Sequence, residues 1–354
     1  MIYNFTDLIL LVGTNPLPNY VTAKYFLNNN LELKQIWLIF SERNNNQEGT
    51  KELAESIKNI LLSEYQSNGL TFQLTGLSDI GSSNTICSDL ANKMKISADT
   101  VLHFNYTGGT KAMAVHAYCF LKEKYGRISF SYLDGREYVL KEDNHGIISD
   151  DLRDEIGISL EKLIDLHGYK KYNSKPHKIQ GDKNNLDDEL RGTEEKLLNP
   201  DETIKGDILE DYVYTVIDIG LKNDPFLSKK YQSGLITMEK NWTIIKKTGN
   251  GKGFELDVII INGYQICPIS CTTSKNIDKC KTKSFEVWHR AKQIGGEEAK
   301  KIFVSRYDKN LIEDFKADLE TISGFSESNF KVLSRSDLKR NDLWTIIKNF
   351  IWGS

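Results

Sequence analysis

The sequence has no long hydrophobic run, and none of its apolar stretches approaches the roughly 20 residues that a membrane-spanning helix requires. The chain passes from MIYNFTD straight into the apolar run LILLV, without the basic segment and cleavage site of a secretory signal. Both absences argue against membrane insertion and export. We therefore expect a soluble, cytoplasmic protein.

Cysteine is scarce, with five residues scattered over 354 positions, and this odd, dispersed set does not indicate a disulfide framework. Cys267, Cys271 and Cys280 form a C-x3-C-x8-C-x8-H pattern with His289. The pattern raises the question of zinc but lacks the paired C-x2-C spacing of structural zinc sites. Small buried thiols are the simpler interpretation.

Charge of one sign is also lacking, since the formal net charge is only −3, which does not indicate a nucleic-acid-binding protein. Residues 271–310 differ, because they contain ten Lys or Arg residues against five Asp or Glu residues. A local basic patch is typical of proteins that contact a phosphate backbone. A solvated helix face is the alternative interpretation.

The first 140 residues alternate short apolar runs with amphipathic stretches, a pattern typical of a parallel sheet covered by helices on both faces. It predicts a doubly wound, Rossmann-like domain. The expected strands are 8–12, 36–40, 70–74, 100–104 and 128–133, and the expected helices are 19–28, 47–65 and 110–124.

Three loops rich in Gly, Ser, Thr and Asn follow these strands: GTNPLPNY, GLSDIGSSN and NYTGGTK. Such sheets bind ligands at the carboxyl ends of their strands, and the helix after NYTGGTK directs free N–H groups toward the loop. Neither a Walker A motif nor a G-x-G-x-x-G fingerprint is present. We expect a phosphate or nucleotide site without ATP hydrolysis or NAD binding; a tight turn with a solvated Lys111 is the alternative.

Polar, lysine- and asparagine-rich composition between residues 141 and 200 indicates a domain boundary. We divide the chain into a sensor domain (1–150), a connector (151–200) and a second α/β domain (201–354). Within the second domain the pattern predicts a helix (206–221), a strand (234–247) and a hairpin (254–261 and 264–270) turning at Asn262-Gly263. A further helix (277–294) and a strand (301–305) follow.

Asp257 interrupts a buried apolar strand, where a bare charge is expensive unless it meets a cation. Glu255 lies on the same face of that strand, and Glu210 lies on the preceding helix. Together they predict a carboxylate cluster for Mg2+ or Mn2+. An aspartate paired with a lysine is the competing interpretation.

Carboxylates on a hairpin with lysines nearby resemble the PD-(D/E)xK nuclease arrangement, which hydrolyses phosphodiesters with a metal ion. The family places an acid and a lysine on the second strand of the hairpin, where this chain has Ser270-Cys271-Thr272. Glu286 is the candidate replacement for the acid, and Lys281 or Lys283 for the lysine. The remaining alternative is a degenerate site that binds without cutting.

The first half resembles a CRISPR-associated Rossmann-fold (CARF) sensor domain, in LILLVGTNPLPNYVTAKYF (8–26) and HFNYTGGTKAMAVHAY (103–118). The second half resembles the restriction-endonuclease-like domain of CARF ancillary nucleases in type III CRISPR antiviral defence. Its matching stretches are EDYVY (210–214), ELDVI (255–259), SCTTS (270–274) and FEVWHRAKQIGGEEAKKIFVS (285–305).

The resemblance implies a homodimer that binds a cyclic oligoadenylate, most often the tetra-adenylate, and then cleaves DNA, RNA or both as a metal-dependent endonuclease. The implied ligand residues are Gly13, Thr14, Asn15, Asn105, Thr107, Gly108, Gly109, Thr110 and Lys111. The implied catalytic residues are Glu210, Asp257, Ser270, Lys281, Lys283 and Glu286, of which Glu210, Asp257 and Glu286 would hold the metal. A cyclic-oligoadenylate-sensing binding protein with a non-cleaving nuclease fold is the alternative, and an enzyme acting on nucleotides at NYTGGTK is weaker because that loop has no carboxylate base.

Overall fold

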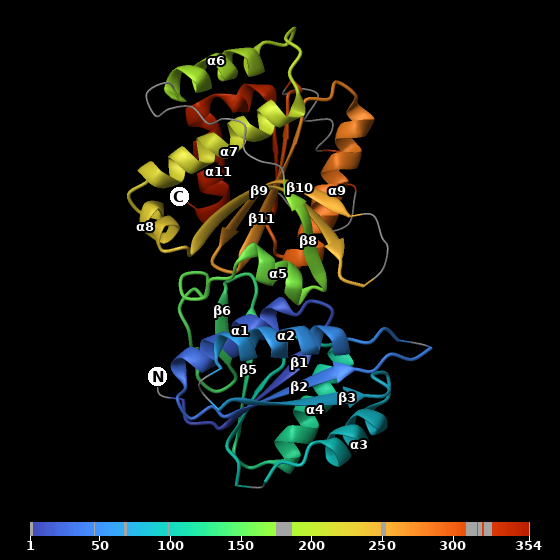
Figure 1. Ribbon diagram of the computed structural model, residues 1–354. Coiled ribbons are helices and arrows are strands. Elements are labelled where there is room, and N and C mark those ends of the chain that lie inside the picture. The colour runs from blue at the N-terminus through green and yellow to red at the C-terminus, as the bar shows by residue number, and fades with distance from the viewer. Residues whose placement is uncertain are drawn as a thin grey trace. The chain divides into compact units, whose positions relative to one another are not determined.

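The fold is that of a computed structural model, which describes residues 3–353 except 46, 67–68, 98, 175–185, 249–252, 309–316, 318–320 and 322–327. The chain divides into two units, Met1–Tyr169 and Lys170–Ser354, called here the first and second unit (Figure 1). Each contains one sheet with helices packed against it.

The sheet of the first unit has the strand order β3-β2-β1-β4-β5-β6-β7. Its first five strands are parallel, and β6 and β7 continue the sheet in antiparallel fashion. The direction in which successive strands are added reverses between β1 and β4, which places a topological switch point there. The strands are β1 (Asp7–Val12), β2 (Gln35–Ser41), β3 (Thr71–Leu77), β4 (Leu102–Asn105), β5 (Ile128–Asp134), β6 (Val139–Glu142) and β7 (Gly146–Ile147).

Helices cover both faces of this sheet, because β1, β2 and β4 are buried on both sides and need apolar partners on each. Figure 1 shows α1 and α2 on one face and α3 and α4 on the other. The apolar side of α4 (Met113, Ala117, Leu121) packs against Ile9 and Phe104. The helices are α1 (Leu17–Asn29), α2 (Lys51–Glu64), α3 (Ser83–Lys93) and α4 (Lys111–Lys124).

The predicted Rossmann-like fold of the first half is thus confirmed, although strands β6 and β7 and helix α3 were not predicted. This helix begins inside the stretch GLSDIGSSN, which its composition marked only as a loop. Ser82 is its N-cap, and the Ser82 hydroxyl accepts a hydrogen bond from Thr85 N. A run of Ser and Asn is typical of loops and helix starts alike, so the pattern did not separate the two.

The segment 151–200 contains regular elements as well as connecting chain. These are α5 (Leu160–Leu166), β8 (Tyr169–Ser174) and α6 (Leu186–Leu198), while 175–185 lie outside the described residues. Helix α5 forms because Leu160, Leu163 and Ile164 bury an apolar side. Its N-cap, Ser159, accepts a hydrogen bond from Lys162 N.

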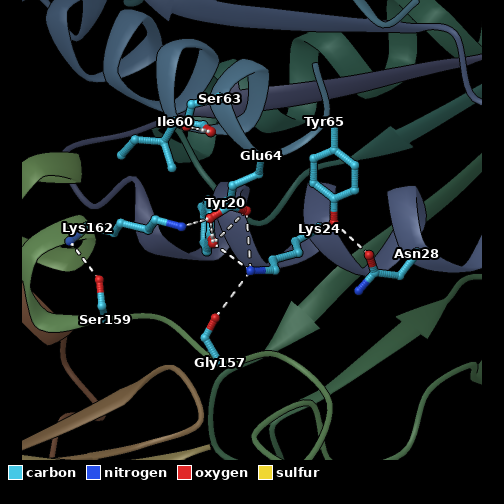
Figure 2. Close-up of polar contacts among 10 residues, drawn as sticks. All are labelled: Tyr20, Lys24, Asn28, Ile60, Ser63, Glu64, Tyr65, Gly157, Ser159 and Lys162. Atoms are coloured by element: carbon cyan, nitrogen blue, oxygen red, sulfur yellow. Dashed lines mark hydrogen bonds and ion pairs between the residues drawn. The ribbon is translucent and has the colours of Figure 1, made fainter. Parts of the chain in front are cut away.

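A half-buried carboxylate, Glu64, connects α5 to the body of the first unit. Figure 2 shows Glu64 at the end of α2, between Tyr20 and Lys24 of α1 and Lys162 of α5. The Tyr20 hydroxyl and the Lys162 ammonium donate to Glu64 Oε1, and Lys24 Nζ is 3.3 Å from Oε2. Lys24 also donates to the carbonyl of Gly157, just before α5. Three helices therefore share one ionic cluster.

The second unit is built on a six-stranded sheet in the order β13-β12-β11-β10-β9-β8. Strands β9, β10 and β11 pair antiparallel, while β11, β12 and β13 pair parallel. The strands are β9 (Ile236–Lys246), β10 (Phe254–Asn262), β11 (Gln265–Thr272), β12 (Lys301–Ser305) and β13 (Phe330–Leu333). The described helices are α6, α7 (Gly206–Asn223), α8 (Leu227–Gln232), α9 (Ile277–Gly295), η1 (Arg335–Leu338) and α11 (Arg340–Trp352).

Successive side chains of β12 point to opposite faces of this sheet, so they show which helices cover each face. Ile302 and Val304 pack with the apolar sides of α7 and α11, whereas Phe303 packs with α9. The cysteines divide in the same way, since Cys267 and Cys271 lie in the α7 core and Cys280 in the α9 core. This separation, and their burial, agree with structural thiols.

The predicted hairpin of β10 and β11 differs by one residue at its turn. Asn262 pairs with Gln265, so the two loop residues are Gly263 and Tyr264 rather than Asn262 and Gly263. Gly263 has φ = +63°, a conformation that two-residue hairpin loops need at their first position and that glycine adopts without strain. No helix in the described parts of the chain is long and apolar enough to cross a membrane.

Candidate functional site

The first candidate site lies at the switch point of the first unit, where β1 and β4 run side by side. The loops after these strands are in close contact, because a side chain on Gly108 would collide with the carbonyl oxygen of Leu11. A Cβ on Gly13 would lie 2.8 Å from Gly109 N. Gly109 itself has φ = +73°, which favours glycine. The glycine pair therefore lets the two loop backbones come into contact at the carboxyl ends of β1 and β4.

Thr107 and Asn105 use their polar groups within the protein. The Thr107 hydroxyl donates to Asn105 Oδ1 (2.6 Å) and accepts from Leu133 N (2.7 Å), and Asn105 Nδ2 donates to Ser131 Oγ (3.0 Å). Asn105 is fully buried. These two predicted ligand residues shape the loop, since the single donor of the threonine hydroxyl is already engaged.

Thr110 and Lys111 stand at the start of α4. Thr110 is the N-cap, and its hydroxyl accepts from Met113 N (3.2 Å). Lys111 is exposed and forms no ion pair with any residue that the structure describes. The first turn of a helix has free N–H groups and a positive partial charge, so this helix end and the Lys111 ammonium suit an anion.

His167 contacts the loop after β1 and was not among the predicted ligand residues. Its Nε2 lies 3.2 Å from Asn15 Oδ1 and its Nδ1 lies 2.8 Å from the carbonyl oxygen of Leu163 in α5. Asn15 Oδ1 also accepts from Leu17 N, which identifies it as the oxygen. Burial lowers the pKa of His167 to about 4, so the ring is neutral at pH 7 and its one N–H serves a single acceptor.

The second candidate site surrounds Asp257 on β10, which is 8% exposed. Asp257 Oδ2 accepts hydrogen bonds from Ser270 Oγ (3.0 Å) and from Cys271 N (2.8 Å), both on β11. Lys283 of α9 reaches the same oxygen, with Nζ 3.7 Å away, and donates to the Cys271 carbonyl (3.1 Å). The helix thus brings a lysine to the aspartate, although the hairpin strand has none.

Asp257 borders a polar cavity of about 130 Å³. Three further predicted residues line it, Ser270, Lys283 and Glu286, and so do Glu255 and Arg290. Lys281 is absent from the lining. At roughly 3.6 residues per turn, positions 281 and 283 point about 160° apart on α9, so only one of the two lysines faces the cavity.

Glu210 of α7 lies near Cys271 but does not line this cavity. Burial raises the pKa of the Cys271 thiol well above its usual value, and the nearby charges of Asp257 and Glu210 raise it further. No three His, Cys, Asp or Glu side chains within the described ranges are grouped closely enough to hold a metal ion. The predicted trio of Glu210, Asp257 and Glu286 is therefore not assembled here, although Asp257 and Glu286 share one cavity.

The donor chemistry of this cavity nevertheless fits a hard cation. Asp257, Glu255 and Glu286 offer carboxylate oxygens, and Asp257 Oδ1 accepts no hydrogen bond from the described residues. Mg2+ commonly binds through one or two carboxylates and keeps several of its waters. Two protein ligands are thus sufficient for such an ion.

The family comparison bears on the first unit. Residues 8–158 match the family model described as the Card1 CARF domain. None of the curated proteins compared with the chain matches it. The match confirms the resemblance of the first half to CARF sensor domains.

Solved structures resemble the chain along nearly its whole length. VC1899 from Vibrio cholerae has a TM-score of 0.68 at 13% identity, covering 98% of both chains. Can2 from Sulfobacillus thermosulfidooxidans, solved in complex with cyclic tetra-adenylate, has a TM-score of 0.59 at 17% identity, covering 96% of both. A type III CRISPR defence DNA nuclease activated by cyclic oligoadenylate has a TM-score of 0.53 at 15% identity, covering 87% of this chain and 46% of that one. At these identities the likeness establishes the shared two-domain α/β fold.

Proposed function

We propose, from the premise that residues 8–158 form a CARF domain, that a cyclic oligoadenylate binds the first unit and switches on phosphodiester cleavage by the second. The observation that carries the proposal is Lys283 beside Asp257, with Nζ 3.7 Å from Oδ2. Lys283, on α9, supplies the cationic side chain that the β10–β11 hairpin lacks. The physiological setting would be type III CRISPR antiviral defence.

The activator is proposed to be cyclic tetra-adenylate, as in the Can2 complex. Its phosphates would meet the α4 N-terminus, Lys111, and the loop carrying Thr14 and Asn15. A ring of four identical units has two-fold symmetry, and an isologous homodimer presents each loop twice to such a ring. Tighter binding to one arrangement of the dimer would shift the population toward the active state.

In the second unit, Asp257 and Glu286 would hold Mg2+ or Mn2+. The ion, when bound, supplies Lewis-acid stabilisation of the phosphate and a nucleophilic water. Lys283 would neutralise the charge that develops on the phosphate oxygens as water adds to phosphorus and one P–O ester bond breaks. Ser270 holds Asp257 in position through its hydrogen bond.

A specific observation supports the alternative, a sensor with a nuclease fold that binds without cutting. Ser270 and Thr272 stand where the PD-(D/E)xK pattern has its second acid and its lysine. One oxygen of Asp257 is also already satisfied by the protein itself. In this version the second unit would recruit nucleic acid when the activator is bound.

Cleavage assays separate the two functions. Plasmid DNA and single-stranded RNA are incubated with the full chain and Mg2+ or Mn2+, with and without cyclic tetra-adenylate or its larger and smaller rings. We expect cutting only with metal and activator together, and its loss in Asp257→Asn. Intact substrates under every condition would establish the non-cleaving alternative, and equal cutting by Asp257→Asn would place the active site elsewhere.

A further inference from the structure

The cavity beside Asp257 contains a guanidinium group to which the proposed cleavage assigns no role. Arg290 of α9 lines this cavity together with Lys283 and Glu286. In the sequence it is one of the ten basic residues of the stretch 271–310. Its seven-residue spacing from Lys283 was the available signal, because positions seven apart share a helix face.

Two contacts hold the Arg290 side chain in place. Its Cζ lies 4.2 Å from the centroid of the Phe254 ring, so the plane of the guanidinium is supported by an aromatic face. Its Nη1 donates to Gln293 Oε1 at 3.0 Å, one turn along the same helix. The group is therefore oriented before any ligand arrives.

The opposite edge of the guanidinium has no acceptor among the described residues. Arg290 Nε is buried and meets no acceptor in the described parts of the chain, and Nη2 forms no hydrogen bond there either. Glu255 and Glu286 line the same cavity, yet neither forms an ion pair with Arg290. A buried N–H without a partner is destabilising, so this edge favours a ligand with acceptors.

The geometry of that edge selects the ligand chemistry. Nε and Nη2 form a planar fork that matches two oxygens of one phosphate or carboxylate. The cavity is already bordered by carboxylates, and the proposed substrate has a phosphate at every nucleotide. A phosphate of the nucleic-acid strand offers two oxygens to this fork. It therefore fits this cavity as the ligand of Arg290.

Two lysines of α9 lie on the same face of the helix as Arg290 and form a cationic surface with it. Lys279, Lys283 and Arg290 fall on one face of the helix, since their separations of four and seven residues are close to whole turns. Lys279 is exposed and has no ion pair with a described residue. Arg290 lies about 10 Å along the helix axis from Lys283, at a rise of 1.5 Å per residue.

We propose that Arg290 binds a phosphate of the nucleic-acid strand next to the one being cleaved, and that the strand follows the face of α9 formed by Lys279, Lys283 and Arg290. This inference rests on the proposed nuclease function and adds to it a path for the substrate. It assigns Arg290 to substrate positioning and leaves Lys283 at the reacting phosphate.

The test measures binding without cleavage. The parent is the full-length Asp257→Asn chain, saturated with cyclic tetra-adenylate and supplied with Mg2+. The probes are a fluorescein-labelled single-stranded DNA, the equivalent RNA and a DNA duplex, titrated between about 50 and 200 mM salt, a range over which phosphate contacts change affinity strongly. Arg290→Gln is compared with the parent, with Arg290→Lys and with Lys292→Gln, and thermal unfolding checks that each variant folds.

We expect Arg290→Gln to weaken binding about ten- to hundredfold and to reduce the slope of log affinity against log salt by about one. Arg290→Lys should keep the slope but lose affinity, because an ammonium cannot form the fork. Lys292→Gln removes the same charge from the opposite face of α9, where Lys292 pairs with Glu297 at 2.6 Å, and should change neither quantity.

The outcomes distinguish this inference from the function on which it rests. An unchanged slope for Arg290→Gln with a parent that binds normally would overturn the Arg290 assignment alone. A parent that binds none of the probes would overturn both the assignment and the nuclease proposal. Arg290-dependent binding by a wild type that never cuts would support the assignment together with the non-cleaving alternative.

Discussion

Lys283 is the residue on which the cleavage proposal depends. A strand lysine and a helix lysine serve equally well if their ammonium groups arrive at the same point, because the electrostatic requirement concerns position and not order in the chain. Lys283 meets that requirement, since its Nζ contacts both Asp257 and the Cys271 carbonyl. Lys281, two residues earlier, does not line the cavity.

We predict that Lys283→Ala lowers the cleavage rate by about a hundredfold or more, as expected for loss of a group that stabilises transition-state charge. Lys281→Ala serves as the matched control and should only weaken substrate binding in a salt-dependent manner. Initial rates at saturating activator and substrate measure the difference. Equal losses in the two variants would contradict the placement of α9.

The second residue-scale prediction concerns Lys111. Lys111→Ala should weaken cyclic tetra-adenylate binding by about 1.5–3 kcal/mol, the typical contribution of a charged hydrogen bond, without unfolding the protein. Calorimetry measures the affinity. Lys122→Ala is the control, because Lys122 is also exposed on α4 but lies about 16 Å further along the helix. Unchanged affinity in Lys111→Ala would exclude this lysine from the ligand site.

At the scale of elements, α5 is the part of the first unit whose attachment is most easily tested. It runs immediately before β8, the edge strand of the second sheet, and its C-cap His167 lies beside Asn15 of the ligand loop. Its polar attachment is the Glu64 cluster of Figure 2. Burial alone would raise the pKa of Glu64, but the Lys162 hydrogen bond and the charges of Lys24 and Lys162 together lower it.

We predict that Glu64→Gln lowers the free energy of unfolding by about 1–3 kcal/mol at pH 7, because charged hydrogen bonds are lost. A lowered carboxylate pKa stabilises the fold above the unfolded value of about 4.3, and this contribution disappears as the pH falls through the folded value. The difference between wild type and Glu64→Gln should therefore shrink at acidic pH. Urea unfolding across this range measures it.

Glu55→Gln is the matched control for that experiment. Glu55 lies on the same helix, and its pair with Lys51 is 3.9 Å long and exposed to solvent on both sides. Such surface pairs contribute about 0–1 kcal/mol. A Glu64→Gln variant no less stable than Glu55→Gln at pH 7 would show that the cluster does not stabilise α5.

At the scale of the whole molecule, we predict a homodimer both with and without activator. The symmetry of the expected ring motivates this, and α4 leaves Val115 (57% exposed) and Cys119 uncovered on its outer side, one turn apart. Size-exclusion chromatography with light scattering should give twice the mass of one chain in both conditions. A monomer in both would contradict the prediction.

Sequence alone determined the strands β1–β5 and β9–β12 and the helices α1, α2, α4, α7 and α9, because apolar periodicity reports directly which side of an element is buried. It also located the glycine loop at residues 108 and 109 and singled out Asp257, since a charge in a buried strand is costly wherever the strand lies. It did not predict α5, β8 and α6 within the polar segment 151–200. Helix α3 was not predicted, because the Ser and Asn residues at its start are equally typical of a loop.

Only the tertiary structure decided which side chains meet. It separated Lys283 from Lys281, placed His167 against Asn15, and brought Arg290 into the cavity of Asp257. These residues are distant in the chain or offset by two positions on one helix, and the packing of α9 against β11 or of α5 against α1 and α2 determines their distances. Periodicity identifies the buried face of an element, whereas its partner and its rotation follow from the packed core.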